Sequence, residues 1–345
     1  MMSVEARMVR TLALALSAIT LVAGCHVDDA TDDAGIPVDL SVADATSAPD
    51  PDAGKQHHVK TVFVLVMENH SWTSIKGSSS APYINRTLLP MSSHAEMYTT
   101  PPGNHPSEPN YIWLEAGGAL GITDDNPPSA NHQSTHEHLV TQLDAAGVTW
   151  HSYQEGITDG TCPLTATGLY DPKHNPMLFF DDVSDTLSTS STKCIAHMSS
   201  FDKLTTDLAA GTVSRYNFIT PNLCNDMHGE AFGTTCQSLV TDLVKVGDTF
   251  LSTMVPKIMA SPAFIDDGAL FIVWDEGDEP AFGNASDGPI GAIVVSPLGK
   301  GNNYAGTLKY THSSTLRTVE TIFGVSFLRD ASNAADLRDL FVTFP

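Results

Sequence analysis

The chain has 345 residues, and its 40 acidic side chains outnumber its 17 lysines and arginines, which gives a formal net charge of -23 at pH 7. This length is enough for one large α/β domain or two small ones. The acidity excludes nucleic acid as a partner, and it excludes adhesion to anionic lipid by charge. An anionic substrate would be repelled as well, so a phosphate site in this chain needs a cation to reverse the local sign of charge.

The first 25 residues have the features of a lipoprotein signal peptide. Arg7 and Arg10 precede an apolar run over 11–23, which is too short to span a bilayer as a stable helix. The run ends in Leu-Val-Ala-Gly-Cys, which resembles a bacterial lipobox. We therefore expect export, lipidation of Cys25, and a membrane anchor that faces the periplasm or the cell surface. A plain signal peptide with a chance cysteine is the alternative.

Residues 26–56 have the composition of a tether. They contain eight aspartates, three prolines and no aromatic residue. Such a segment buries too little apolar surface to offset the entropy lost on ordering. We predict a disordered acidic spacer, followed by a folded domain over 57–345.

From residue 57 onward, strand-like and helix-like patterns alternate. Strands are predicted over 59–67, 148–153, 213–220, 269–274 and 291–296, and helices over 82–97, 135–146, 239–259 and 313–323. The run over 59–67 is almost entirely apolar, which is typical of a strand buried on both faces of a parallel sheet. This alternation indicates a three-layer α/β/α sandwich with a mostly parallel central sheet.

Four cysteines remain beyond the lipobox: Cys162, Cys194, Cys224 and Cys236. An even number in an exported chain indicates two disulfides, and four cysteines allow three pairings. We favour Cys162–Cys194 and Cys224–Cys236 because each closes a local loop. A zinc site is the alternative, although no CxxC pair supports it. The first pair lies within 155–207, where we predict a long disulfide-clamped excursion over the site instead of a sheet element.

Acidic pairs follow two of the predicted strands. Glu68 and Asn69 come directly after 59–67, and Asp275 and Glu276 after 269–274. Ligands of open α/β sheets bind at the edge where parallel strands end. Two acidic pairs converging there would repel each other unless a cation lay between them. Oxygen donors favour Ca²⁺, Mg²⁺ or Mn²⁺ over zinc, and iron is a further possibility. The alternatives are a helix N-cap at Asn69 and a solvated turn at Asp275.

Ser107 lies in the segment His-Pro-Ser-Glu-Pro-Asn, where two prolines stiffen the backbone. Coordination to a metal would lower the pKa of its hydroxyl and make it a nucleophile toward phosphorus. Asn110 could donate its side-chain NH₂ to a phosphate oxygen. A proline-ordered surface turn is the alternative.

Four histidines have informative neighbours: His105, His174, His228 and His312. Each could protonate a leaving oxygen or bind phosphate, although a single histidine is more often structural than catalytic.

Seven segments in unbroken order together resemble the bacterial phosphoesterase family: VLVMENHS, APYIN, HPSEPNYIWLEAG, KHNP, ITPNLCNDMH, VWDEGD and THSSTLRTVETIFG. That family groups secreted acid phosphatases with phospholipases C, and its fold is similar to that of the alkaline phosphatase superfamily. The resemblance implies that Glu68, Asn69, Asp275 and Glu276 bind a divalent metal. It also implies that Ser107 is both a metal ligand and the nucleophile.

The same resemblance implies roles around the phosphoryl group. His105, His174 and His228 would surround it as catalytic residues. Four more residues would contact the small phosphorylated substrate: Asn110, Asn222, Asp226 and His312. The position of Asn110 is also similar to that of the phosphate-holding asparagine in the Thr-x-Pro-Asn motif of nucleotide pyrophosphatases.

The phospholipase branch usually has Glu-Asn-Arg-Ser where this chain has Glu-Asn-His-Ser at 68–71, and we expect none of the large C-terminal domains that many phospholipases carry. Both features favour the small acid phosphatase branch. We therefore expect a metal-dependent phosphomonoesterase that acts through a phosphoserine. A phosphodiesterase of the phospholipase C type and a non-catalytic metal-binding surface lipoprotein are the alternatives.

Overall fold

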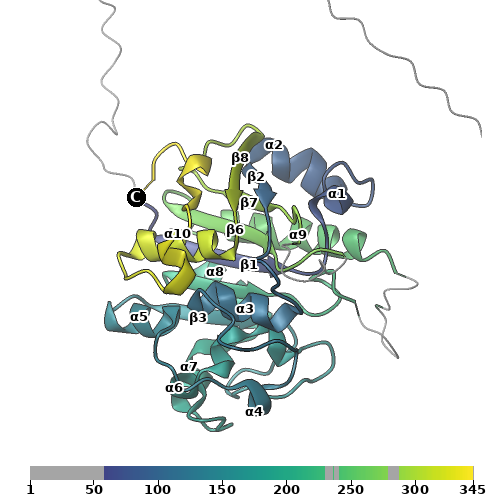
Figure 1. Ribbon diagram of the computed structural model, residues 1–345. Helices are drawn as coiled ribbons and strands as arrows, with labels where there is room; N and C mark the ends of the chain where they lie inside the picture. Colours follow the sequence, from purple (N-terminus) through teal and green to yellow (C-terminus); the bar gives the residue numbers. More distant parts are fainter. Residues whose placement is uncertain (1–57, 230–235, 237–240, 279–286, 345) are drawn as a thin grey trace, which may run out of the picture. The chain divides into compact units, whose positions relative to one another are not determined.

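Within the residues that the computed structural model describes, which are 58–229, 236, 241–278 and 287–344, the chain forms an eight-stranded sheet with helices on both faces (Figure 1). The strand order is β4-β3-β5-β1-β6-β7-β2-β8. The strands are β1 (Thr61–Met67), β2 (Ser93–Tyr98), β3 (Trp150–Gln154), β4 (Met198–Ser199), β5 (Tyr216–Thr220), β6 (Gly268–Trp274), β7 (Ala292–Val295) and β8 (Tyr304–Tyr310). The predicted signal peptide, the lipidation of Cys25 and the tether lie outside the described residues.

Strand β7 runs antiparallel to both of its neighbours, β6 and β2, whereas the other neighbouring pairs are parallel. At the centre, all seven residues of β1 are buried. This is why its sequence is continuously apolar instead of alternating. The carboxyl ends of β5, β1 and β6 therefore meet at one edge of the sheet, as predicted from the sequence.

The longer helices are α3 (Ser107–Ala116), α5 (Leu139–Ala145), α8 (Phe201–Ala210), α9 (Leu243–Met259) and α10 (His312–Phe323). Short helical segments connect them: α1 (Trp72–Ile75), η1 (Ile84–Leu88), α2 (Leu89–Met91), α4 (Pro128–Asn131), η2 (Pro172–His174), η3 (Pro176–Phe179), α6 (Asp181–Ser184), α7 (Thr192–His197), η4 (Arg329–Ser332) and η5 (Leu337–Leu340).

Ring contacts of the central strands show which helices cover which face of the sheet. Tyr216 and Phe218 of β5 point to the same side, because side chains alternate along a strand, and they contact Phe323 of α10 and Tyr111 of α3. Phe63 of β1 pairs in register with Asn217, so it points to the other side, where it meets Phe264 just beyond α9. Helices α3 and α10 thus cover one face and α8 and α9 the other (Figure 1), which confirms the predicted three-layer sandwich.

Several element predictions are wrong. The helix predicted over 82–97 ends at Met91, because Ser92 adopts an extended backbone and the chain continues as strand β2. The segment around Ser107, for which a surface turn was the alternative interpretation, is the first turn of α3. The excursion over 155–207 includes the short edge strand β4 and the helix α8, although neither was expected there.

Both predicted disulfides are confirmed: Cys162 pairs with Cys194, and Cys224 with Cys236. The first ties the start of the 155–207 stretch to α7, and the second joins two cysteines with a sequence separation of 12. None of the helices in the described part of the chain combines the length and the apolar composition that crossing a bilayer requires.

Candidate active site

Three buried carboxylates follow three neighbouring strands at the carboxyl edge of the sheet. Glu68 follows β1, Asp275 follows β6, and Asp226 lies in the loop after β5; all three side chains are 0% exposed. Backbone bonds lock them together, because Glu68 donates its N–H to Asp226 at 2.8 Å and Asp275 donates its N–H to Met67 at 2.9 Å. The alternation along β1 places Glu68 on the side of Val64, which pairs with Phe218 and therefore faces α3.

Helix α3 brings Ser107 to the acidic edge. Ser107 is the first residue of the helix, after an extended Pro106, and its side chain is 1% exposed. Its Oγ donates to Glu68 Oε2 at 3.0 Å and lies 3.4 Å from Glu276 Oε1. One turn along the helix, Asn110 Nδ2 lies 3.3 Å from Glu276 Oε2. Residues that are far apart in the sequence thus meet around one hydroxyl.

Asn69 lies beside this cluster in a left-handed backbone conformation with φ of 41°. Asparagine adopts this conformation more readily than most residues, so the chain can turn sharply straight after β1. The Asn69 N–H donates to Asp275 Oδ1 at 3.0 Å, and the same oxygen accepts from the N–H of Glu276 at 2.6 Å. The two acidic segments are therefore held in one orientation by their own backbone.

Two of the predicted catalytic histidines contact carboxylates. His174 stacks on Tyr111 at 4.8 Å between ring centroids, and its Nε2 lies 3.2 Å from Glu68 Oε1. His105 contacts Glu276 Oε2 through Nδ1 at 2.7 Å and contacts Asp287 through Nε2. The hydrogen bonds to Asp287 and then to Glu276 raise the pKa of His105 to about 10. His105 is therefore an imidazolium that is held between two acids.

Three residues predicted to bind substrate have their polar atoms engaged by the protein. Asn110 Nδ2 donates to the carbonyls of Asn104 and Pro106, each at 3.2 Å, as well as to Glu276, and its Oδ1 accepts from Asn104 Nδ2 at 2.8 Å. His312 is fully buried; its Nε2 donates to the Asp275 carbonyl at 2.7 Å, and Tyr98 lies 3.1 Å from its Nδ1. Burial lowers the pKa of His312 to about 4. Asn222 Oδ1 accepts the N–H groups of Cys224 and Asn225 at 3.0 and 3.1 Å. His312 therefore holds the backbone of Asp275 in place, and Asn222 stabilises the turn that follows it by accepting two of its backbone N–H groups.

The site also contains residues that sequence reasoning missed. Lys173, beside the predicted His174, places its Nζ 3.1 Å from His228 Nε2 and 3.0 Å from Asp125 Oδ2. Burial opposes its charge, but Asp125 and Glu68 raise the pKa of Lys173 above its ordinary value. Asp287 was not predicted as a site residue. It reaches His105 because β7, which follows it in the chain, runs antiparallel to β6 and therefore begins at this edge of the sheet.

The donor atoms at this edge fit a hard divalent cation. Four buried oxygens have no hydrogen-bond partner among the described residues: Glu68 Oε1, Asn69 Oδ1, Asp226 Oδ2 and Asp275 Oδ2. Burial and the mutual repulsion of these acids raise the pKa of Glu68 and of Asp226 well above the usual range. Burial and then Glu276 raise the pKa of Asp275 to about 8. A cation would satisfy the oxygens and relieve this repulsion.

Two groups of side chains at this edge could hold a metal ion, each with ligand atoms within 4.8 Å of one another: Glu68, His174 and His228, and His105, Glu276 and Asp287. Each group contains carboxylates beside histidine, so iron stays open beside the oxygen-preferring ions.

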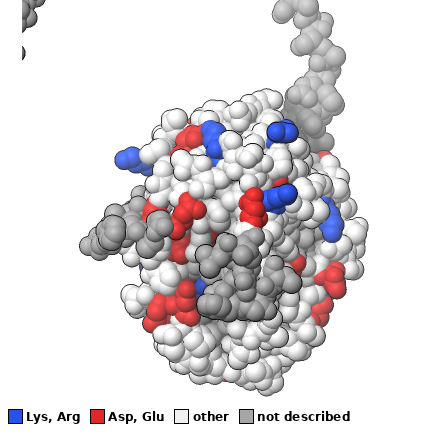
Figure 2. Space-filling model, turned by 90° about the vertical axis from the view of Figure 1, so that its right-hand side faces the viewer, with Lys and Arg blue, Asp and Glu red and all other residues white. Residues whose placement is uncertain are grey.

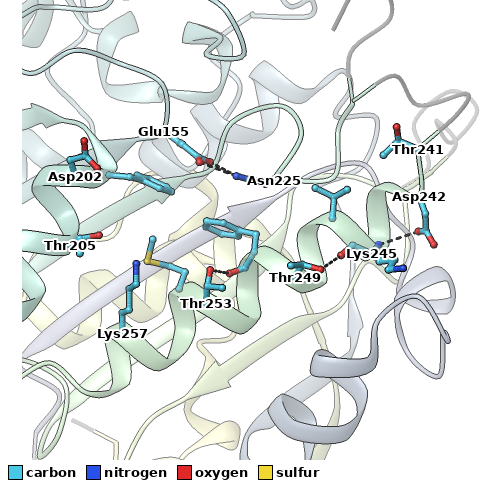
Figure 3. Close-up of a pocket in the computed structure, with 14 residues that line it drawn as sticks. Glu155, Asp202, Thr205, Asn225, Thr241, Asp242, Lys245, Thr249, Thr253 and Lys257 are labelled. Carbon is cyan, nitrogen blue, oxygen red and sulfur yellow. Dashed lines mark hydrogen bonds between the residues drawn. The ribbon is translucent and has the colours of Figure 1, made fainter. Parts of the chain in front are cut away.

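A hollow of about 820 Å³ lies elsewhere, along α9 and beside α8 (Figure 3). In Figure 3, Lys245, Thr249, Thr253 and Lys257 follow one another along the helix. The stacked rings of Phe201 and Phe250 contribute to its apolar wall. None of the predicted site residues lines it, so the volume of a hollow does not by itself identify the active site.

On the face shown in Figure 2, the described lysine and arginine side chains are scattered among acidic ones.

Comparisons with known proteins find relatives among phosphoesterases. A family model described as the Phosphoesterase family matches residues 95–326. A phosphatidylinositol-3-phosphatase from Mycobacterium tuberculosis is 29% identical over 280 residues, which cover 81% of this chain and 82% of that protein. A probable acid phosphatase from Kluyveromyces lactis is 24% identical over 290 residues, which cover 81% of this chain and 62% of that protein.

Solved structures share the fold. A protein of the alkaline phosphatase superfamily from Vibrio parahaemolyticus has a TM-score of 0.52 and 11% identity, with 83% of this chain and 72% of that chain covered. Murine ectonucleotide pyrophosphatase/phosphodiesterase 5 in complex with AMP has a TM-score of 0.52 and 9% identity, with 82% of this chain and 100% of that chain covered. The predicted likeness to the alkaline phosphatase fold is confirmed.

Proposed function

The chain belongs to the phosphoesterase family and is a hydrolase of phosphoric esters, and from this premise we propose that it is an exported, metal-dependent acid phosphatase. Its substrates would be small phosphomonoesters, and Ser107 would carry the phosphoryl group between two half-reactions. The observation that carries the proposal is the Ser107 hydroxyl, which lies at the start of α3 and 3.0 Å from Glu68 Oε2.

A divalent cation bound by Glu68, Asp275 and Ser107, with Asn69 and Glu276 completing the shell, would lower the pKa of the serine hydroxyl. Ser107 Oγ attacks phosphorus, and its proton passes to Glu68 Oε2, the oxygen that already accepts its hydrogen bond. The positive end of the α3 dipole points at the incoming phosphate. Water then attacks the phosphoserine and releases inorganic phosphate.

We assign the proton that the leaving oxygen receives to His174. His105 has both ring nitrogens against carboxylates, and His312 has both engaged behind Asp275. His174 also lies between carboxylates, with Nε2 3.2 Å from Glu68 Oε1 and Nδ1 3.4 Å from Asp226 Oδ2, but Nε2 has no hydrogen-bond partner among the described residues. His174 would therefore take up at Nε2 the proton that Glu68 receives from Ser107 and pass it to the leaving oxygen.

Replacement of the nucleophile tests the mechanism. Ser107→Ala should lower kcat by at least about 10³-fold, because no other group at the site can form the covalent bond to phosphorus. Ser184→Ala is the matched control, since it removes another fully buried hydroxyl, which lies in α6 and donates to the backbone carbonyl of Phe180. Circular dichroism should show both variants folded. A Ser107→Ala protein that retained substantial turnover would remove Ser107 from the mechanism.

Substrate class is tested by comparing a phosphomonoester dye with the matching phosphodiester. The names of the relatives, an acid phosphatase and a phosphatidylinositol-3-phosphatase, support monoesters. We expect kcat/KM for the monoester to exceed that for the diester. The reverse order would favour a phosphodiesterase of the phospholipase C type, and metal binding without any turnover would favour the non-catalytic lipoprotein.

Export and lipid anchoring rest on residues 1–25 and are supported by the two disulfides, which persist in oxidising compartments. Mass spectrometry of the mature N-terminus should find a lipid on Cys25. Cys25→Ala should leave the protein unlipidated and release it from the membrane fraction. An unmodified Cys25 in membrane-bound protein would contradict the anchor.

A further inference from the structure

Lys173 brings a buried positive charge to the acidic edge of the sheet. It lies in η2, beside His174, and is 8% exposed. Its Nζ donates to Asp125 Oδ2 at 3.0 Å, while Asp125 Oδ1 accepts the N–H of Glu108 at 2.9 Å. Glu108 follows Ser107 in the first turn of α3. One chain of hydrogen bonds therefore fixes the ammonium group relative to the helix that carries the nucleophile.

Lys173 acts electrostatically on all four members of the group formed by Glu68, Asp226, His174 and His228. The other charged groups of the site are carboxylates and the His105 imidazolium, which is held between Glu276 and Asp287. A phosphate dianion that approaches Ser107 therefore meets several carboxylates, and the Lys173 ammonium helps to offset them. A chain with a net charge of -23 has particular need of such a charge inside its site.

The contacts of His228 show what holds Lys173 in place. His228 Nδ1 lies 2.6 Å from the carbonyl oxygen of Gly229, and a carbonyl only accepts, so Nδ1 carries the proton. An ammonium group only donates, so Nε2, 3.1 Å from Lys173 Nζ, is the bare acceptor. Both constraints give the same neutral tautomer. His228 therefore presents no proton toward the site, and it orients Lys173.

An ammonium group has three N–H donors, and two of those on Lys173 point at Asp125 and His228. The third has no partner among the described residues. We propose that this third donor of Lys173 binds a phosphoryl oxygen of the substrate and stabilises the charge that develops during transfer to Ser107, with Asp125 and His228 as positioning residues. This inference rests on the proposed function and corrects the catalytic role that sequence reasoning gave to His228.

The test compares the wild-type protein with Lys173→Met. We expect kcat/KM for a phosphomonoester dye to fall by about 100-fold, the usual cost of removing one charged donor from a transition state. Binding of inorganic phosphate, measured as a competitive inhibition constant, should weaken at least about 10-fold. Metal content should stay at the wild-type level, because Lys173 is no ligand. Lys173→Arg should recover part of the lost phosphate binding.

Lys193→Met is the matched control, because Lys193 is also partly buried and pairs with two aspartates, Asp144 and Asp182, away from Ser107. It should retain wild-type kcat/KM. If Lys173→Met fails to fold, Lys173→Gln keeps a donor for Asp125 and serves in its place. A wild-type inhibition constant for phosphate in Lys173→Met or Lys173→Gln would overturn the role of Lys173 and would leave the proposed phosphatase activity unaffected. Wild-type protein without turnover would refute the proposed function, and calorimetric binding of inorganic phosphate would still decide the role of Lys173.

Discussion

Each end of helix α3 has a cluster of acids and histidine, and the two clusters differ in how fully their acids are paired with positive groups. At the carboxyl-terminal end, His138 bridges Glu115 Oε1 and Asp182 Oδ1, each at 2.9 Å. Lys193 adds a further positive charge, 3.2 Å from Asp182. At the amino-terminal end, around Ser107, several acids crowd together. Among the described residues, four buried oxygens of this cluster lack a hydrogen-bond partner, and Glu115 Oε2 lacks one at the carboxyl-terminal end.

Their charge states differ accordingly. Burial would raise the pKa of Asp182, but hydrogen bonds from His138 and Thr141 lower it, so this acid is ionised and paired. Burial and like charges raise the pKa of Glu68 instead. In the carboxyl-terminal cluster His138 and Lys193 pair with the acids, whereas around Ser107 the acids outnumber the positive groups His105 and Lys173, so that this cluster is built to receive a further cation. The comparison therefore separates structural from functional acids on a single helix.

The largest effect should come from breaking the amino-terminal cluster. Asp275→Asn removes a charge that the cation requires, and we expect kcat/KM to fall by about 10³-fold or more while the fold is kept. Metal analysis of the purified variant should show reduced metal. Activity within a few-fold of wild type would show that Asp275 is no part of the metal shell.

Breaking the carboxyl-terminal cluster should lower the stability of the protein and leave its activity nearly unchanged. His138→Ala leaves Glu115 and Asp182 buried without their partner, and we expect the free energy of unfolding to fall by about 3 kcal/mol. Denaturant titration measures this loss. The folded fraction should keep kcat/KM within a few-fold of wild type. Loss of turnover with unchanged stability would reverse the assignment of the two clusters.

Metal removal should distinguish the clusters by stability. With the metal at about 100 times its dissociation constant, chelation should cost the wild-type protein about 2.7 kcal/mol and lower its Tm. The Asp275→Asn protein should show a much smaller shift, and His138→Ala should show the full one. Equal shifts in wild type and Asp275→Asn would place the metal elsewhere.

A smaller effect concerns Glu320 of α10, a buried acid on the scaffold side. Burial raises its pKa to about 8, compared with about 4.3 in an unfolded chain. The folded state therefore holds the proton more tightly, so this contribution to stability is complete below about pH 4 and is lost as the pH rises through about 8. Relative to Glu320→Gln, the wild-type free energy of unfolding should fall by roughly 1 kcal/mol per pH unit between about pH 5 and about pH 7. If the free energies of unfolding of the wild type and of Glu320→Gln changed with pH in parallel, the raised pKa of Glu320 would be contradicted.

The sequence predicted those elements whose hydrophobic pattern is strong. Strand β1 and helix α10 were found because one is continuously apolar and the other has a regular helical period. The edge strand β8 was missed because most of its residues are solvent-exposed, so no apolar pattern marks it. Strand β2 was taken for helix because 82–97 carries apolar residues at helical spacing before the chain turns at Ser92.

The site was predictable where strand ends determine it. Glu68 and Asp275 meet because their strands are neighbours and parallel, and such strands end at the same edge. Lys173 and Asp287 were not predictable, because their positions depend on the path of connecting segments and on the direction of β7. The roles of His312 and Asn222 required atomic contacts, since their chemical groups alone do not show that the protein already engages them.

The account depends on one cation at the amino-terminal end of α3. A crystal structure of the protein soaked in Mn²⁺, with anomalous data collected near the manganese edge, tests this directly. The account predicts a peak within coordination distance of Ser107 Oγ and of the carboxylates of Glu68 and Asp275. A fully occupied peak that lies away from all three, or no peak in a protein that is active with manganese, would contradict it.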